Sequence, residues 1–294
     1  MKALVLSGGG SRGSWQAGAL KYLGEAGYGG FDFVSGTSVG SINACGVAMF
    51  LPEDFTDAVE YISKLWTEKV TKTSDIWKLR CPLGIPALWK PSIGTNDQLE
   101  KLLTDVVDIQ AIRNSGIELR LPAADLETGA LRAYTVDDLE EYGVAPVMAS
   151  ASFPVAFPPV DVGGHWMTDG GLIDIAPLGA AIESGADEIM VLVTRNPKQI
   201  TYKSRNDMKN AIKVGLRDLD IMEQTVLQDD LRICEVYNKL LKAGHKIEGK
   251  REVKITVLYP LEPLADSLDF SGPLMQKQMA QGYSDAKVLL DPCP

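Results

Sequence analysis

Residues 2–13 read KALVLSGGGSRG, a short apolar run that leads directly into a glycine-rich turn. The apolar part predicts a buried β-strand over residues 2–7, and residues 14–26 predict a helix with an apolar face. A strand, a tight glycine turn and a helix in succession are typical of an α/β sheet. This segment therefore predicts the class of fold.

A second unit of the same kind follows. Residues 31–35 predict a strand, residues 36–40 a turn, and residues 41–50 a helix. The turn, Gly36-Thr37-Ser38-Val39-Gly40, fits the pattern G-x-S-x-G, in which a serine lies on a sharp strand-to-helix turn. Ser38 is the candidate nucleophile; an ordinary glycine-rich turn is the alternative interpretation.

Strands and helices alternate through the remainder of the chain, which predicts a three-layer α/β/α domain with a mostly parallel central sheet. No linker or repeat divides residues 1–294, so we expect a single domain. Residues 206–243 predict a long helix broken near Gly215. Residues 71–94 lack a clear period, and we expect them to form part of the mouth of a site, with Trp77 and Trp89 meeting lipid or packing on the core.

The bulk composition excludes several functions. The net charge of −10 argues against nucleic-acid binding and against attraction to anionic bilayers, so any transient membrane contact must use apolar residues. Neither a signal peptide nor a run of about 20 apolar residues occurs, and we expect a cytoplasmic protein, with secretion without a cleaved signal left open. The four cysteines form no C-x-x-C pair, and no acidic calcium motif occurs, so we expect no metal and no cofactor.

The glycine run at residues 8–13 has two interpretations. Glycines entering a helix leave backbone N–H groups free, which suits an anion such as the oxyanion of acyl transfer. Gly8, Gly10 and Gly13 also match the dinucleotide pattern G-x-G-x-x-G, with Asp32 about 20 residues further on. However, the acid of a dinucleotide site lies at the end of its strand, whereas Asp32 lies near the beginning. The oxyanion interpretation is therefore favoured.

The base that would activate Ser38 is not an obvious histidine. His245 lies at the end of a polar helix and His165 lies in a turn, so we expect neither to be the base, although His165 stays an accessory candidate. The turn Asp169-Gly170-Gly171 offers a carboxylate that small neighbours leave accessible. Such a carboxylate needs short contact with the serine and partial desolvation, because its usual pKa near 4 makes it a weak base.

Taken together, the ordered motifs resemble the patatin-like phospholipase family, which shows a G-G-G-x-R-G loop, a G-x-S-x-G elbow and a distal D-G-G/A aspartate. The resemblance covers about residues 1–195; we expect residues 196–294 to be a C-terminal elaboration of helix and strand. Further similar stretches are Ala124 to Gly129, Ala149 to Pro154, Phe157 to Val160, and Asp174 to Leu178, in which Ala176 replaces a frequent asparagine.

The resemblance implies a Ser38–Asp169 dyad, an oxyanion hole formed by the N–H groups around Gly9, Gly10 and Ser11, and hydrolysis of lipid acyl esters without a cofactor. Arg12 would brace the glycine loop, meet a phosphate head group or form a surface ion pair. The remaining motif positions support these groups: Gly8, Gly13, Gly36, Gly40, Gly170 and Gly171. A non-catalytic lipid-binding protein on the same fold and a transacylase are the alternatives, and the sequence does not indicate an oligomeric state.

Overall fold

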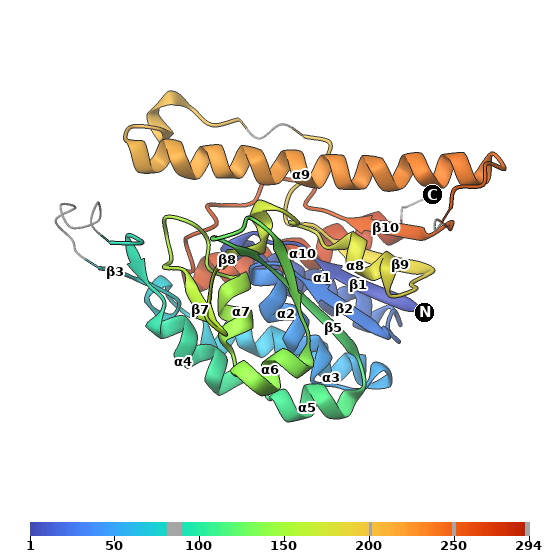
Figure 1. The fold of residues 1–294 in the computed structure, drawn as a ribbon, viewed down its shortest axis with the longest axis horizontal. Coiled ribbons are helices and arrows are strands. Elements are labelled where there is room, and N and C mark those ends of the chain that lie inside the picture. The colour runs from blue at the N-terminus through green and yellow to red at the C-terminus, as the bar shows by residue number, and fades with distance from the viewer. Residues whose placement is uncertain (81–89, 200–201, 249–250, 292–294) are drawn as a thin grey trace.

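A computed structural model describes residues 1–80, 90–199, 202–248 and 251–291. An eight-stranded sheet forms its centre, in the order β10-β9-β1-β2-β5-β8-β7, with β6 beside β5 (Figure 1). The pairs from β10 to β5 are parallel, and the pairs of β5 with β6 and β8, and of β7 with β8, are antiparallel. The strands are β1 Lys2–Leu6, β2 Phe33–Gly36, β5 Glu118–Asp125, β6 Leu131–Tyr134, β7 Val160–Val162, β8 His165–Asp169, β9 Glu188–Leu192 and β10 Lys254–Leu258.

Helices cover both faces of this sheet, which confirms the predicted three-layer α/β/α fold with a mostly parallel sheet. One face packs against most of the helices, and the other against α8 and α9. The helices are α1 Gly13–Glu25, α2 Val39–Ala48, α3 Phe55–Lys64, α4 Asp97–Val106, α5 Ile109–Ser115, α6 Val136–Tyr142, α7 Ala145–Ser150, α8 Leu178–Glu183, α9 Ala211–Lys242 and α10 Gly272–Leu290.

Short elements connect these layers. β3 and β4 form a separate antiparallel pair. β3 lies within residues 71–94, which were expected to lack a regular period, and β4 lies at the end of that range. A π-helical segment, η3, extends α3, and the other elements labelled η are 3₁₀ turns. Their bounds are η1 Gly10–Arg12, η2 Pro52–Asp54, η3 Leu65–Lys69, η4 Thr73–Asp75, β3 Lys78–Leu79, β4 Gly94–Thr95, η6 Gly170–Leu172 and η7 Arg205–Asp207.

The register of β1 and β2 brings the two glycine turns together. Leu6, the last residue of β1, is paired with Gly36, the last residue of β2. Parallel strands end at the same edge of a sheet, so the turns that follow them are neighbours. Crevices at this edge are where α/β proteins bind ligands.

The last helix is tied closely to the first. Trp15 of α1 donates an indole N–H hydrogen bond of 2.9 Å to the buried carboxylate of Asp285 in α10. Gly282 lies so close to the carbonyl of Trp15 that a Cβ there would clash with it. The C-terminal segment is therefore packed into the same core as the first strand-turn-helix unit.

Helix α9 runs across the molecule above the sheet (Figure 1). It continues through Gly215, so the predicted break at that position is wrong. A single glycine costs a helix only about 1 kcal/mol relative to alanine, which the rest of a 32-residue helix can offset.

Candidate active site

Ser38 occupies a strained turn between β2 and α2. Its φ of 56° and ψ of −128° lie outside the regions favoured by a residue with a side chain. Its backbone N–H donates a hydrogen bond of 3.1 Å to the hydroxyl of Ser150, and only 7% of the residue is exposed. Strain of this kind is what the G-x-S-x-G turn predicts for a presented serine.

The turn can form because the glycines at its two ends, Gly36 and Gly40, lack side chains. A Cβ on Gly40 would clash with the carbonyl of Leu6 at the end of β1. The small residue therefore lets the start of α2 lie directly against the first strand. The other motif glycines also lack space for a Cβ: Gly8, Gly9, Gly10, Gly13, Gly36, Gly170 and Gly171.

Asp169 ends β8 and is almost fully buried, with 1% of its surface exposed. One carboxylate oxygen, Oδ1, accepts a hydrogen bond of 2.8 Å from the N–H of Gly171, and the other, Oδ2, accepts none of good geometry from the described residues. Burial raises the pKa of Asp169 to about 8, the negative charge of Glu223 adds to the rise, and the nearby Ser38 hydroxyl and the Gly171 N–H oppose it.

The glycine loop lies beside Ser38 at the end of β1. The N–H groups of Gly9 and Gly10 donate to no group among the described residues, and both glycines line the cavity that contains Ser38. The N–H of Ser11 instead donates a hydrogen bond of 2.8 Å to the carbonyl of Ser267. The third donor expected from the sequence is thus already engaged with the C-terminal segment.

Arg12 is buried, with 7% of its surface exposed, so the surface ion pair considered for it is wrong. Its Nε donates a hydrogen bond of 3.1 Å to the carbonyl of Ala265. Desolvation of the guanidinium lowers the pKa of Arg12 to about 10. Arg12 therefore braces the glycine loop against the segment that precedes α10.

A small cavity of about 50 Å³ opens beside Ser38. Apart from the glycine loop, Arg195 and Glu223, its walls are mostly apolar. A wider cavity of about 510 Å³ adjoins it through shared walls and is lined by Arg12, Arg195 and several acidic and basic side chains. The apolar walls of the small cavity are Val39, Ile42, Trp66, Ile76, Leu99, Ala151, Phe153, Phe157, Leu268 and Phe270.

Trp77 lies behind this wall rather than at its rim. The side chain is partly buried, its indole N–H donates a hydrogen bond of 3.3 Å to the carbonyl of Leu268, and its ring contacts the edge of Phe157 with centroids 6.4 Å apart. Of the two interpretations of Trp77, core packing is the one that the structure supports. Trp89, the other predicted tryptophan, lies outside the described residues.

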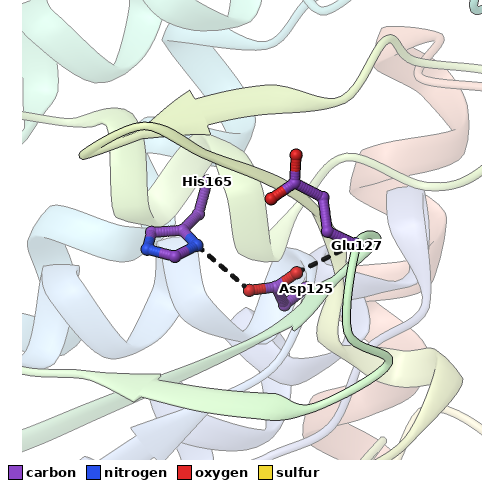
Figure 2. Close-up of side chains that lie close together, drawn as sticks. All are labelled: Asp125, Glu127 and His165. Atoms are coloured by element: carbon purple, nitrogen blue, oxygen red, sulfur yellow. Dashed lines mark hydrogen bonds and ion pairs between the residues drawn. The ribbon is translucent and has the colours of Figure 1, made fainter.

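His165 starts β8 and therefore lies at the end of that strand opposite Asp169. Figure 2 shows it with Asp125 and Glu127, whose ligand atoms lie within 4.8 Å of one another. His165 Nδ1 is 3.3 Å and Arg132 Nε is 3.4 Å from the same Asp125 oxygen. The guanidinium already supplies a positive charge there, which disfavours a metal ion. His165 does not line the cavity of Ser38.

The remaining alternatives for histidine and dinucleotide chemistry find no support. His245 is exposed just beyond α9, as expected for a helix-terminal residue. Asp32 accepts a hydrogen bond of 2.8 Å from the N–H of Lys2 at the start of β1. The glycine loop lies at the opposite end of that strand, so Asp32 does not have the position that a dinucleotide site requires.

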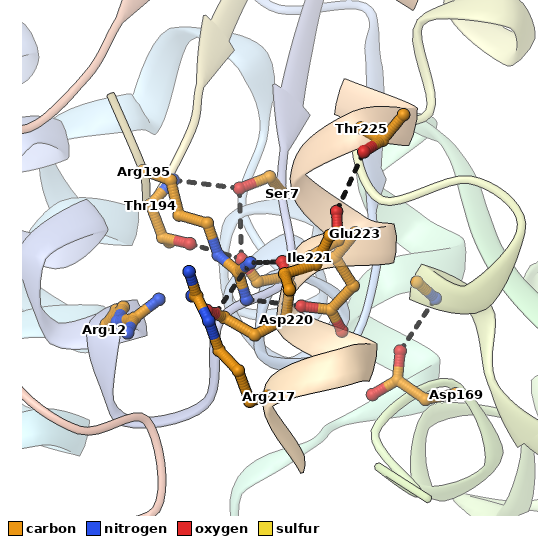
Figure 3. A network of polar contacts seen from close by, with 12 residues as sticks. Ser7, Arg12, Asp169, Thr194, Arg195, Arg217, Asp220, Ile221, Glu223 and Thr225 are labelled. Atoms are coloured by element: carbon orange, nitrogen blue, oxygen red, sulfur yellow. Dashed lines mark hydrogen bonds and ion pairs between the residues drawn. The ribbon is translucent and has the colours of Figure 1, made fainter. Parts of the chain in front are cut away.

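A group of charged side chains at the site was not predicted from the sequence. Arg195 follows β9 and pairs with Asp220 and Glu223 of α9, as Figure 3 shows. Residues 196–294 were expected only to be a C-terminal elaboration of helix and strand, yet they supply both acids. One signal was present: Leu219, Glu223, Leu227 and Leu231 repeat every fourth residue, so a glutamate occupies a place on the inward row of a helix.

The fold and the site define a class of protein, a three-layer α/β/α protein with a serine on a strained strand-to-helix elbow beside a glycine-rich loop. The sequence pattern described as patatin-like phospholipase matches residues 4–182. The chain belongs to the patatin-like phospholipase family, as its motifs predicted. Membership supports lipid hydrolysis at the level of the family.

Curated relatives agree with this assignment. The chain is 29% identical over 191 residues to patatin-like phospholipase domain-containing protein 7 of Rattus norvegicus, covering 65% of this chain and 13% of that protein. It is 28% identical over 191 residues to patatin-like phospholipase domain-containing protein 6 of Homo sapiens, with the same coverage of both chains. It is also 28% identical over 190 residues to neuropathy target esterase sws of Drosophila melanogaster, covering 64% of this chain and 12% of that protein. The chain thus spans about an eighth of the length of these relatives.

Among solved structures, VipD from Legionella pneumophila is similar, with a TM-score of 0.46 and 16% identity over 99% of this chain and 66% of that chain. None of the helices among the described residues combines the length and the apolar character needed to span a membrane.

Proposed function

We propose that this chain is a serine hydrolase of lipid acyl esters, with Ser38 as nucleophile and Asp169 as base. The observation that carries the proposal is a strained, positive-φ serine that opens onto an apolar cavity beside a buried aspartate with one carboxylate oxygen free of hydrogen bonds of good geometry. A free carboxylate oxygen in a desolvated site is suited to accept the proton of a serine hydroxyl.

In the acylation step, Ser38 Oγ attacks the ester carbonyl carbon while Asp169 takes the hydroxyl proton. The negative charge develops on the former carbonyl oxygen, and we assign its stabilisation to the N–H groups of Gly9 and Gly10 in place of the engaged Ser11 donor. The C–O bond to the leaving alcohol then breaks, and the alkoxide takes the proton back from Asp169. An alkoxide needs less protonation help than an amine, so this arrangement favours esters over amides.

Deacylation repeats the chemistry with water as the nucleophile. Asp169 takes a proton from the water, the oxyanion forms again, and the bond between the carbonyl carbon and Ser38 Oγ breaks with return of the proton to Ser38. An alcohol or lysolipid in place of water would make the same acyl-enzyme a transacylase. The products separate these two outcomes, because hydrolysis releases a free fatty acid.

The two adjoining cavities favour a substrate with an apolar and a polar part. The apolar walls beside Ser38 suit the start of an acyl chain, and the wider charged cavity suits the polar end of the ester. Because the net charge is −10, we expect contact with a lipid surface through apolar side chains, insensitive to added salt.

The test is activity of the purified chain on a panel of p-nitrophenyl esters and phospholipids, beside Ser38→Ala. We expect release of alcohol and fatty acid by the wild-type chain and none above background by the variant. Lipid binding without turnover would instead support the non-catalytic alternative and overturn the proposal.

A further inference from the structure

Glu223 of α9 lies beside the turn that carries Asp169. It is 4% exposed, although its helix neighbours Ile221, Met222 and Thr225 are exposed. It lines the cavity of Ser38 together with the glycine loop. A buried acid is costly unless it is paired, so the partner and the surroundings of Glu223 bear on its role.

The carboxylate of Glu223 is oriented by a partner. Its Oε2 accepts a short hydrogen bond from Arg195, and Figure 3 shows this pair between α9 and the end of β9. Its Oε1 faces the Asp169 turn: this oxygen and Oδ1 of Asp169 both lie within 3.3 Å of the point where a Cβ of Gly171 would stand. Gly171 therefore leaves the space in which the two carboxylates approach each other.

The charges around Glu223 determine its ionisation. Burial raises the pKa of Glu223, Arg195 opposes the rise, Asp220 adds to it, and Arg12 opposes it from η1. The group facing Glu223 from the Asp169 turn is the dyad carboxylate itself. Arg195 also binds the carboxylate of Asp220 at 2.8 Å, so one guanidinium is shared between two acids of α9.

We propose that Glu223 is a positioning residue that makes Asp169 a stronger base toward the hydroxyl of Ser38. A second negative charge beside a carboxylate favours its protonated form, so the proton taken from the serine is accepted more readily. The inference rests on the proposed function, because it assigns a role in the same proton transfer.

The physical need for such a residue comes from the weakness of aspartate as a base. An exposed aspartate has a pKa near 4 and accepts a serine proton poorly. Here burial raises the pKa of Asp169 to about 8, and Glu223 is the next cause of the rise. Asp169 must be ionised to act, so we expect activity of the wild-type chain to increase with pH up to about 8.

The test is the pH dependence of kcat/KM on a soluble p-nitrophenyl ester for the wild-type chain and Glu223→Gln. We expect the acid limb of Glu223→Gln to move to lower pH, and its plateau at high pH to fall roughly three- to tenfold because the base is weaker. Glu223→Asp keeps the negative charge but holds it one methylene further from Asp169. The acid limb of its pH–rate profile should therefore lie between those of the wild-type chain and Glu223→Gln.

The matched control is Glu235→Gln, on the same helix, where Glu235 is exposed and paired with Lys239 at 2.7 Å. It should leave the limb unmoved. If both Glu223 variants have a lower kcat/KM at every pH and the acid limb does not move, Glu223 has only a structural role. That result would overturn the inference. If turnover persists in Ser38→Ala, the proposed function fails; if turnover depends on Ser38 while the limb stays in place, only the role of Glu223 fails.

Discussion

Gly8 and Ser38 lie against each other although they belong to different turns. A Cβ on Gly8 would lie 3.0 Å from the Cβ of Ser38 and 2.5 Å from the Cδ1 of Ile175. The contact follows from the parallel register of β1 and β2, which ends both strands at one edge of the sheet. The loop proposed to bind the oxyanion is thereby fixed beside the proposed nucleophile.

From this contact we predict that Ser38 is the only residue labelled by a fluorophosphonate probe. The elbow presents the hydroxyl, and the N–H groups of Gly9 and Gly10 stabilise the charged adduct. Intact-mass spectrometry followed by peptide mapping measures the labelling. Ser38→Ala should be unlabelled, and an adduct on that variant would refute the assignment.

For the base, we predict that Asp169→Asn lowers kcat by about a thousandfold or more while the chain stays folded, because an amide cannot accept the serine proton. Steady-state kinetics and circular dichroism measure the two effects. His165→Ala and His245→Ala serve as controls and should keep most activity, since neither histidine lines the cavity. A comparable loss in His165→Ala would replace the dyad with a histidine mechanism.

Asp169 also makes stability depend on pH. The pKa of Asp169 is about 8 in the folded chain and near 4 in the unfolded chain. Between these pH values the folded chain holds a proton on Asp169 that the unfolded chain has lost. The free energy of unfolding therefore decreases as pH rises from about 4 to 8. Asp169→Asn removes this contribution. We expect the variant to gain on the order of a few kcal/mol relative to wild type by pH 8 and little at pH 4.

Denaturant titrations of both proteins across this range measure the difference. Asp174 is partly buried, and desolvation raises its pKa to about 7; it contributes in the same direction in both proteins, so it cancels in the comparison. A constant difference between pH 4 and 8 would contradict the predicted titration of Asp169.

For the wall of the cavity, we predict that Trp77→Ala lowers the melting temperature and reduces rates on a short soluble ester and on a long-chain phospholipid to a similar extent. Loss of an indole that packs on Phe157 leaves a void behind the wall. Because Trp77 is only partly buried, we expect a cost below the roughly 3–5 kcal/mol of truncating a fully buried aromatic ring. Trp77→Phe is the conservative control. A selective loss of phospholipid hydrolysis with unchanged stability would restore the role at the mouth.

For the C-terminal segment, we predict that Gly282→Ala destabilises the whole chain by more than about 2 kcal/mol, because the new methyl group meets the carbonyl of Trp15. Gly215→Ala in α9 is the matched control: nothing lies within 4 Å of its Cβ position, so it should stabilise by about 0.5–1 kcal/mol. Thermal unfolding measures both. Two separate transitions in Gly282→Ala would contradict the single domain that we expect.

Much of the architecture could be predicted from local pattern. The glycine turns at residues 8–13 and 36–40 and the strands before them follow from apolar runs and from residues that only tight turns need. Gly215 misled the prediction of α9, because a local propensity of about 1 kcal/mol is overridden by the packing of Glu223 and Leu227 on the body of the protein.

The sequence by itself determined the two opening strand-turn-helix units, the class of fold, the family, and the candidate residues Ser38 and Asp169, because these follow from short motifs whose spacing is a local property of the chain. Only the tertiary structure decided that the N–H of Ser11 is engaged by Ser267, that α10 packs on α1, and that Glu223 reaches the Asp169 turn. These contacts join segments far apart in the chain. They form because the sheet and its two helical layers bury apolar surface together, and no local pattern specifies which distant side chains that packing brings into contact.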